Sequence, residues 1–171
     1  MLSYGDLSLR TINFVFLVII LGLSGSLAAT TNTQHNSQVN FIVFTAAWGL
    51  LTSTCYGIAA NFFSFLASPL FLTITDFLNT IFTFAGATAL AKVIGCHSCT
   101  NSSYLDGNSV AQGDKNRCRK SQATVAFTYF SFFVFLFSLV ISAISITKNG
   151  LLGYNSRPKI ARTGVPTMSQ V

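Results

Sequence analysis

Four apolar blocks, each long enough to cross a bilayer as a helix, run through this 171-residue chain. They cover residues 11–29, 41–61, 70–91 and 123–146. A membrane-spanning helix needs about 20 apolar residues, and in lipid a helix satisfies its own backbone hydrogen bonds within one segment. The pattern therefore predicts an all-α integral membrane four-helix bundle in one domain, residues 1–146, followed by a tail of residues 147–171.

The composition excludes a soluble globular protein. Hydrophobic residues make up 51% of the chain and charged residues 8%, whereas soluble domains carry about 25% charged residues. The ten Lys and Arg residues lie at the edges of the apolar blocks and not on one hydrated face, which excludes a basic nucleic-acid-binding module. We interpret the net charge of +6 as a charge of the membrane flanks.

The first block also has features of a secretory signal. Arg10 precedes it, and Ser26 and Ala28 suit the positions before a cleavage site. Its apolar run is, however, longer than the core of about 7 to 15 residues that a signal has, and Asp6 weakens the positive leader. We therefore favour a first transmembrane helix.

Four crossings place both ends of the chain on one side of the membrane and the long loop, residues 92–122, on the other. Lys and Arg are equally divided between the two sides, so the positive-inside rule does not decide the orientation. Two features favour an exoplasmic loop. Asn101 opens an Asn-Ser-Ser glycosylation acceptor, and the cysteines of the loop form disulfides only in an oxidising compartment. We therefore expect the N- and C-termini to be cytosolic.

Two of the predicted helices are rich in small residues, which allow close contact between helix backbones in lipid. These residues are Gly22, Gly25 and Ser26 in the first helix and Ala85 and Ala89 in the third. Pairs of small residues recur at a spacing of four, so they share a helix face. We expect the two stripes to touch in the outer half of the bilayer. The alternative is that these residues only tolerate contact with lipid.

Asp76 is the one full charge that interrupts the apolar blocks, and a carboxylate at depth usually faces the bundle interior and has a partner. Thr73 and Asn79 share its helix face at spacings of three. Asn13 and a snorkelling Arg10 are the candidate partners on the first helix. We favour a polar staple between helices formed by Asp76, Asn79 and Asn13. The alternative is a proton or ion site, although transporters usually distribute several polar groups along a path.

The third block is followed by a C-x-x-C motif at residues 96–99, and Cys118 lies near the start of the fourth block. A zinc site needs four suitably spaced ligands, which the motif does not supply. A redox centre of a membrane thiol oxidoreductase would use Cys96 and Cys99 as a dithiol, but such enzymes also need a second cysteine pair. We favour a structural disulfide that joins Cys118 to either Cys99 or Cys96 and restrains the loop.

An ordered set of stretches covers nearly the whole chain: LRTINFVFLVIILGLSGSL, CYGIAANFF, DFLNTIFTFAGATALA, HSCTNSSYLDG, RCRKSQATVAFTYFS and the closing GVPTMSQV. Together they resemble the fungal non-classical export protein family, whose members are four-helix MARVEL-type proteins. The resemblance implies cytosolic ends, a plasma-membrane location in eisosome-type microdomains, a role in organising those domains in response to sphingolipid, and a link to unconventional secretion. It also implies cysteines at Cys99 and Cys118, whereas Cys96 departs from the family's pattern.

The tail carries the cations Lys148, Arg157, Lys159 and Arg162. Near the anionic cytoplasmic leaflet each cation contributes about 1 kcal/mol, so we expect an extended tail that lies along this surface. The leading hypothesis is a non-enzymatic membrane organiser that uses no cofactor or metal. Its expected partners are sphingolipids, anionic inner-leaflet lipids, further copies of itself and eisosome-associated proteins. The alternatives are a thiol oxidoreductase that uses Cys96 and Cys99 and a small transporter that uses Asp76.

Overall fold

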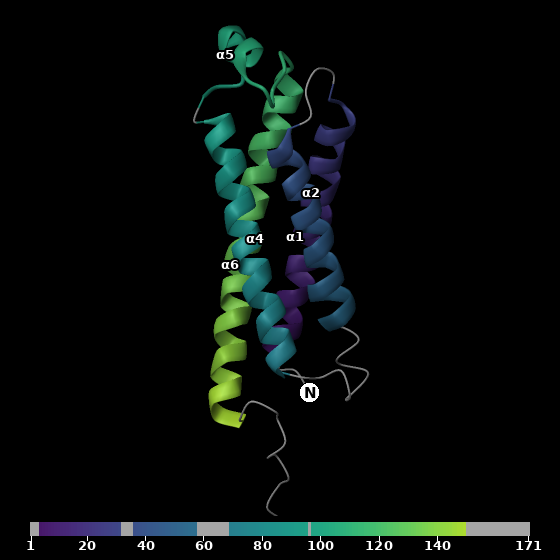
Figure 1. Cartoon of the computed structure of the whole chain (residues 1–171), viewed down its shortest axis with the longest axis vertical. Helices are drawn as coiled ribbons and strands as arrows, with labels where there is room; N and C mark the ends of the chain where they lie inside the picture. The colour runs from purple at the N-terminus through teal and green to yellow at the C-terminus, as the bar shows by residue number, and fades with distance from the viewer. Residues whose placement is uncertain (1–3, 32–35, 58–68, 96, 150–171) are drawn as a thin grey trace, which may run out of the picture.

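The computed structural model describes residues 4–31, 36–57, 69–95 and 97–149, and every regular element in these ranges is helical. The elements are α1 (Tyr4–Ala29), α2 (Ser37–Gly49), the π-helix η1 (Leu50–Tyr56), α4 (Pro69–Ile94), α5 (Ser102–Gly107) and α6 (Lys115–Asn149). Figure 1 shows α1, α2, α4 and α6 side by side along the long axis, with the short α5 at one end. The start of α1 and the end of α6 lie at the opposite end.

Three of the helices are long and apolar enough to cross a membrane. These spans are Leu7–Ala29, Leu70–Ile94 and Lys115–Ile144. The remaining rod of the bundle, the second along the chain, consists of α2, which has 13 residues, and of η1, which continues it for seven more. Residues 58–61 of the predicted second block lie outside the described residues. The predicted all-α membrane bundle is confirmed.

The helices extend beyond the apolar blocks that predicted them. α1 begins at Tyr4 and α6 at Lys115, rather than at 11 and 123. Asp114 stands at the N-cap of α6, where its Oδ1 accepts the backbone N–H of Asn116 at 2.8 Å, and such a cap stabilises the start of a helix. The predicted loop of residues 92–122 therefore contains the end of α4, all of α5 and the first turns of α6.

Around the bundle, the helices follow the order α1, α2, α4, α6. α6 packs against α1 and α4, and α2 packs against the same two helices from the other side. α1 and α4 therefore lie diagonally opposite each other. The core includes Leu17, Ile42, Leu90 and Phe135, which are at most 1% exposed. Because lipid tails are as apolar as these side chains, close packing stabilises the core more than exclusion of water does.

The predicted contact between the small residues of α1 and α4 is not found, because the two helices are diagonal. A Cβ atom added to Gly22 or Gly25 meets nothing within 4 Å. Ala85 is exposed and Ala89 is half-buried. These residues therefore do not form the predicted α1–α4 interface.

Two other contacts replace the one that was predicted. Ser26 faces α6, where its Oγ accepts a hydrogen bond from Nζ of Lys120 at 2.8 Å. Gly86 of α4 approaches α2, since an added Cβ would lie 3.3 Å from Cγ1 of Ile42. Small residues thus matter where neighbouring helices meet, and composition alone did not identify which helices are neighbours.

Candidate functional site

The outward faces of the long helices carry large apolar side chains that are at least 42% exposed. They are Ile12, Phe14, Val15 and Val18 on α1, Phe71, Ile74, Phe77, Ile81 and Phe84 on α4, and Phe130, Phe133, Phe137, Val140 and Ile144 on α6. Soluble monomers rarely expose apolar patches of this extent. In a bilayer this surface is the one that meets the acyl chains.

A buried ion pair joins α1 and α4 across the diagonal. Nη2 of Arg10 donates to Oδ2 of Asp76 at 3.0 Å, and the two side chains are 4% and 1% exposed. Ser138 of α6 donates its Oγ–H to the same oxygen at 3.1 Å. Three helices are therefore tied together at one level, in the half of the bundle that contains the start of α1. Arg10 is buried and does not snorkel to the surface as predicted.

Gly57 has no side chain and so leaves room for the buried side chain of Arg10. A Cβ added to Gly57 would lie 3.1 Å from Cδ of Arg10 and 3.2 Å from Nη1. The backbone that follows η1 thus passes directly against the arginine side chain, and a larger residue at this position would push it aside.

The other two residues predicted for the polar staple bind different helices. Oδ1 of Asn13 accepts the Oγ–H of Ser131 in α6 at 2.6 Å. Nδ2 of Asn79 donates to Oγ1 of Thr52 in η1 at 2.8 Å. Both asparagines are at most 1% exposed. Asp76 thus bonds to α1 and α6, Asn79 to η1 and Asn13 to α6, so the three predicted residues contribute to separate links between helices.

Sequence reasoning missed the hydroxyl partners Ser131, Ser138 and Thr52. A hydroxyl inside an apolar helix gives little signal, because it can bond to its own backbone, as Thr52 does to the carbonyl oxygen of Trp48 at 2.8 Å. The sequence contains one signal for the two serines. They are seven residues apart, and two turns of helix place them on the same face of α6.

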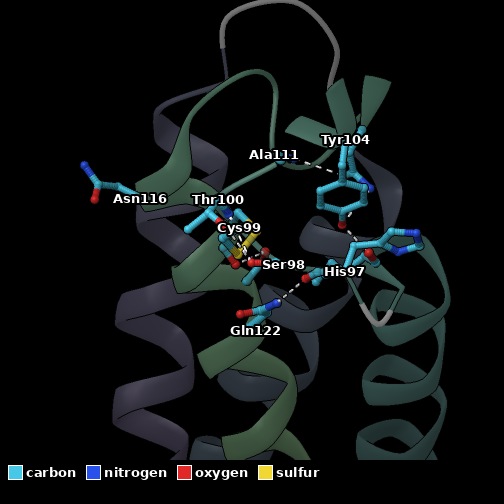
Figure 2. The surroundings of a disulfide bond; sticks show 12 residues. His97, Ser98, Cys99, Thr100, Tyr104, Ala111, Asn116 and Gln122 are labelled. Atoms are coloured by element: carbon cyan, nitrogen blue, oxygen red, sulfur yellow. Dashed lines mark hydrogen bonds between the residues drawn. A yellow bond between two sulfur atoms is a disulfide. The ribbon is translucent and has the colours of Figure 1, made fainter. Parts of the chain in front are cut away.

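At the other end of the bundle, the residues between α4 and α6 form a compact cap, residues 97–114. A disulfide joins Cys99 to Cys118, with the two Cα atoms 5.8 Å apart (Figure 2). Both cysteines are buried. The sequence left both Cys99 and Cys96 as possible partners of Cys118. In the structure the partner is Cys99, and Cys96 lies outside the described residues.

Val110 of the cap plugs the end of the bundle. It is fully buried and belongs to the same core cluster as Leu27 of α1. Asn108 holds the turn in place, because its Nδ2 donates to the carbonyl oxygen of Val93 at 2.8 Å and its Oδ1 accepts the N–H groups of Val110 and Ala111 at 3.0 and 3.1 Å. The cap is therefore part of the bundle core and not a hydrated linker.

Arg117 fastens this cap to α1. Its Nε donates to the carbonyl oxygen of Val110 at 3.1 Å. Its Nη1 donates to the carbonyl oxygen of Leu27 at 3.1 Å and to Oγ1 of Thr30 at 2.6 Å. The carbonyls of the last helical turn lack partners within the helix, and a cation there also meets the negative end of the helix dipole. Arg117 thus caps the C-terminus of α1.

Tyr104 connects the cap to the end of α4. Its ring lies flat against His97, with ring centroids 4.8 Å apart and planes at 5° (Figure 2). Its hydroxyl donates to the carbonyl oxygen of Ile94 and accepts from Nδ2 of Asn108 at 3.2 Å. Burial raises the pKa of the Tyr104 hydroxyl above its ordinary value of 10.0, so the hydroxyl remains a donor at physiological pH.

The remaining predicted residues lie at helix ends or outside the described ranges. Asn101 is exposed and occupies the N-cap of α5. Lys148 is in the last turn of α6, and Arg157, Lys159 and Arg162 lie outside the described residues. The part of the chain that the structure describes contains no group of three or more His, Cys, Asp or Glu side chains suited to a metal ion.

Lipid-facing helices around paired polar groups are the architecture of a multi-pass membrane protein, and comparison with known families gives the class. MARVEL, a membrane-associating domain, matches residues 3–141. The chain belongs to this family.

Relatives with the same extent refine this assignment. The chain is 61% identical to Non-classical export protein 102 of Candida albicans over 171 residues, which cover 100% of both chains. It is 49% identical to Non-classical export protein 2 and to its homolog 1, both of Saccharomyces cerevisiae, again over 100% of both chains. No solved structure shows a significant match. The resemblance to the non-classical export protein family is confirmed.

Proposed function

We propose that this protein organises eisosome-type microdomains of the plasma membrane, without catalysing a reaction, and that it responds to sphingolipid or to the state of the bilayer. The MARVEL domain supports a membrane-associated role. The names of the relatives support a link to non-classical export, that is, to unconventional secretion. In this proposal both ends face the cytosol and the cap lies outside the cell.

The observation that carries the proposal is the aromatic outer face of α4 and α6. Phe84, Phe130, Phe133 and Phe137 are at least 50% exposed. Rigid rings along a lipid-facing helix make its fit depend on bilayer thickness and acyl-chain order. A mismatch costs a fraction of a kcal/mol per Å, so a difference of a few Å between membrane regions is enough to sort the protein between them.

The contacts of Asp76 and Cys99 favour this proposal over the two alternatives. Asp76 is hydrogen-bonded to Arg10 and Ser138, which is the arrangement of a structural link between helices, whereas a transport site has to exchange the partner of its carboxylate for an ion. Cys99 is bonded to Cys118, whereas a thiol oxidoreductase would have to pair Cys99 with Cys96.

Other partners follow from the same proposal. The cations of the tail, Lys148, Arg157, Lys159 and Arg162, bind anionic lipids of the inner leaflet. Copies of the protein meet one another through their lipid-facing helices, and eisosome-associated proteins bind on the cytosolic side. Sphingolipids contact the outer half of the helices.

A fluorescent fusion of the full chain, expressed in yeast that lacks its own relatives of the protein, tests the proposal. We expect the wild type to concentrate in stable patches of the plasma membrane and to disperse when sphingolipid synthesis is blocked. Replacing Phe130, Phe133 and Phe137 together by Leu should lower the enrichment about twofold, the effect of a few tenths of a kcal/mol. Leucine keeps the apolar character and removes the rigid ring.

The matched control replaces Val15 and Val18 by Leu. These residues of α1 are exposed to a similar degree and carry no ring, so the enrichment should stay unchanged. A uniform distribution of the wild type would contradict the proposal. So would a solute flux into liposomes that the substitution Asp76→Asn abolishes.

A further inference from the structure

The second rod of the bundle changes its helix type partway along its length. α2 is α-helical for 13 residues, and η1 continues as a π-helix for seven. α1 and α4 have 26 residues each and α6 has 35, so the second rod is the shortest in the described part of the chain. π-helices are rare and frequently lie at functional sites.

Close contacts lie directly before and directly after η1. A Cβ added to Gly49 would lie 3.1 Å from Leu17 of α1 and 3.6 Å from Phe135 of α6. A Cβ added to Gly57 would lie 3.1 Å from Arg10, the arginine of the buried ion pair. The π-helix thus connects a contact in the apolar core to a contact at the ion pair.

The hydrogen bonding beside η1 is incomplete. Asn79 donates from Nδ2 to Thr52, but its Oδ1 has no hydrogen-bond partner among the described residues, and neither has Nε1 of Trp48. Both atoms are buried, and unmet buried polar groups reduce stability. These two atoms belong to α2 and α4, directly beside the π-helix.

We infer that η1 adjusts the length of the second rod by changing between π-helical and α-helical form as the thickness of the bilayer changes. A π turn closes over five residues rather than four, so a π-helix covers less length per residue than the about 1.5 Å of an α-helix. Conversion of η1 to an α-helix lengthens the rod, and a thicker bilayer favours the longer form because it reduces the mismatch.

This change of length reaches other helices. Lengthening moves Gly57 along the side chain of Arg10, and Arg10 holds α1 to α4 through Asp76. The inference rests on the proposed function for its biological meaning, since it supplies the element through which the protein senses the state of the bilayer.

Hydrogen exchange of the full-length wild type in nanodiscs tests the inference. The nanodiscs are made from phosphatidylcholines of increasing acyl-chain length. We expect the backbone amides of residues 50–56 to exchange several-fold more slowly in thick than in thin bilayers, while residues 80–90 of α4 serve as an unchanged internal reference. Exchange in residues 50–56 that does not vary with thickness, or varies as much as the reference, would overturn the inference.

A deletion variant gives an independent check. Leu51 is 65% exposed, so its deletion removes one residue of the wide turn without removing a core side chain. In this variant residues 50–56 should exchange slowly at every thickness, whereas Leu51→Ala should keep the wild-type dependence. If exchange in the deletion variant depends on bilayer thickness as it does in the wild type, the inference is overturned. If the deletion prevents folding, the thickness dependence of the wild type alone tests the inference.

The two proposals can fail separately. A thickness-dependent η1 in a protein that forms no patches in cells supports the inference and contradicts the proposed function. A thickness-independent η1 in a protein that does form patches overturns the inference alone.

Discussion

Arg10 and Asp76 place two opposite charges inside an apolar bundle. The net contribution of such a pair to stability is small, because removing both groups from water costs about as much as their attraction returns. Each charge is expensive without the other. We therefore expect the pair to act mainly through specificity, by selecting the arrangement in which Arg10 of α1 and Ser138 of α6 both meet Asp76 of α4.

Substitution of one partner should expose this cost. Asp76→Asn leaves the positive charge of Arg10 buried, so we expect the free energy of unfolding in detergent micelles to fall by about 3 to 5 kcal/mol. The double variant Arg10→Met with Asp76→Leu should recover most of the loss. Asp106→Asn, at an exposed position of the cap, is the matched control and should have no effect. Equal losses in the single and double variants would contradict this account.

The sequence identified the right buried polar residues but not most of their partners. A charge in an apolar block must be paired, which is why Asp76 was predictable as an interior residue and Arg10 and Asn13 as its candidate partners, although Arg10 was expected to snorkel and not to be buried. The partners Ser131, Ser138 and Thr52 depend on how α6 and η1 are rotated about their axes. Rotation is set by packing of the whole bundle, and no single helix encodes it.

The cap between α4 and α6 is held to the bundle by Val110, Arg117 and the disulfide. We expect Cys99→Ala to lower the free energy of unfolding by roughly 3 kcal/mol, the loop-closure estimate for a loop of this size. Cys96→Ala should leave it unchanged. Unfolding curves and the mobility of both variants on non-reducing gels measure this. A loss confined to Cys96→Ala would mean that the disulfide uses the other cysteine.

The glycines of α1 and α2 should respond oppositely to a methyl group. Gly22→Ala and Gly25→Ala add a Cβ where nothing lies within 4 Å, so we expect a gain of about 0.5 to 1 kcal/mol from the better helix former. Gly49→Ala adds one 3.1 Å from Leu17 and should cost about 1 to 3 kcal/mol through overpacking. Thermal unfolding of the three variants measures both effects. A loss for Gly22→Ala would indicate that this face of α1 packs against another molecule.

The apolar blocks predicted the existence of the long helices well and their ends poorly. Hydropathy falls where charges begin, but Asp114 and Arg117 continue α6 beyond its apolar part, because a capped helix tolerates polar residues at the membrane surface. No residue type in η1 distinguishes its sequence, LLTSTCY, from that of an α-helix. It lies between the close contacts of Gly49 and Gly57, which sequence periodicity does not reveal.

At the scale of the whole molecule, the proposed orientation places the cap outside the cell and both ends inside. A membrane-impermeant amine reagent applied to intact cells should therefore label Lys115, which is exposed beside the cap, and should leave Lys148 and Lys159 unlabelled. Permeabilised cells, in which all three should react, are the control. The reverse labelling pattern would invert the topology and would also exclude a glycan on Asn101.

The buried ion pair also dictates an order of assembly. Asp76 follows Arg10 by 66 residues, which at about 5 to 20 residues per second corresponds to roughly 3 to 13 seconds of synthesis. During that interval Arg10, near the start of the first span (Leu7–Ala29), has no Asp76 to pair with. The link between the first and third helices therefore forms only after the third helix has been synthesised, and the bond from Ser138 to Asp76 forms later still, when α6 follows.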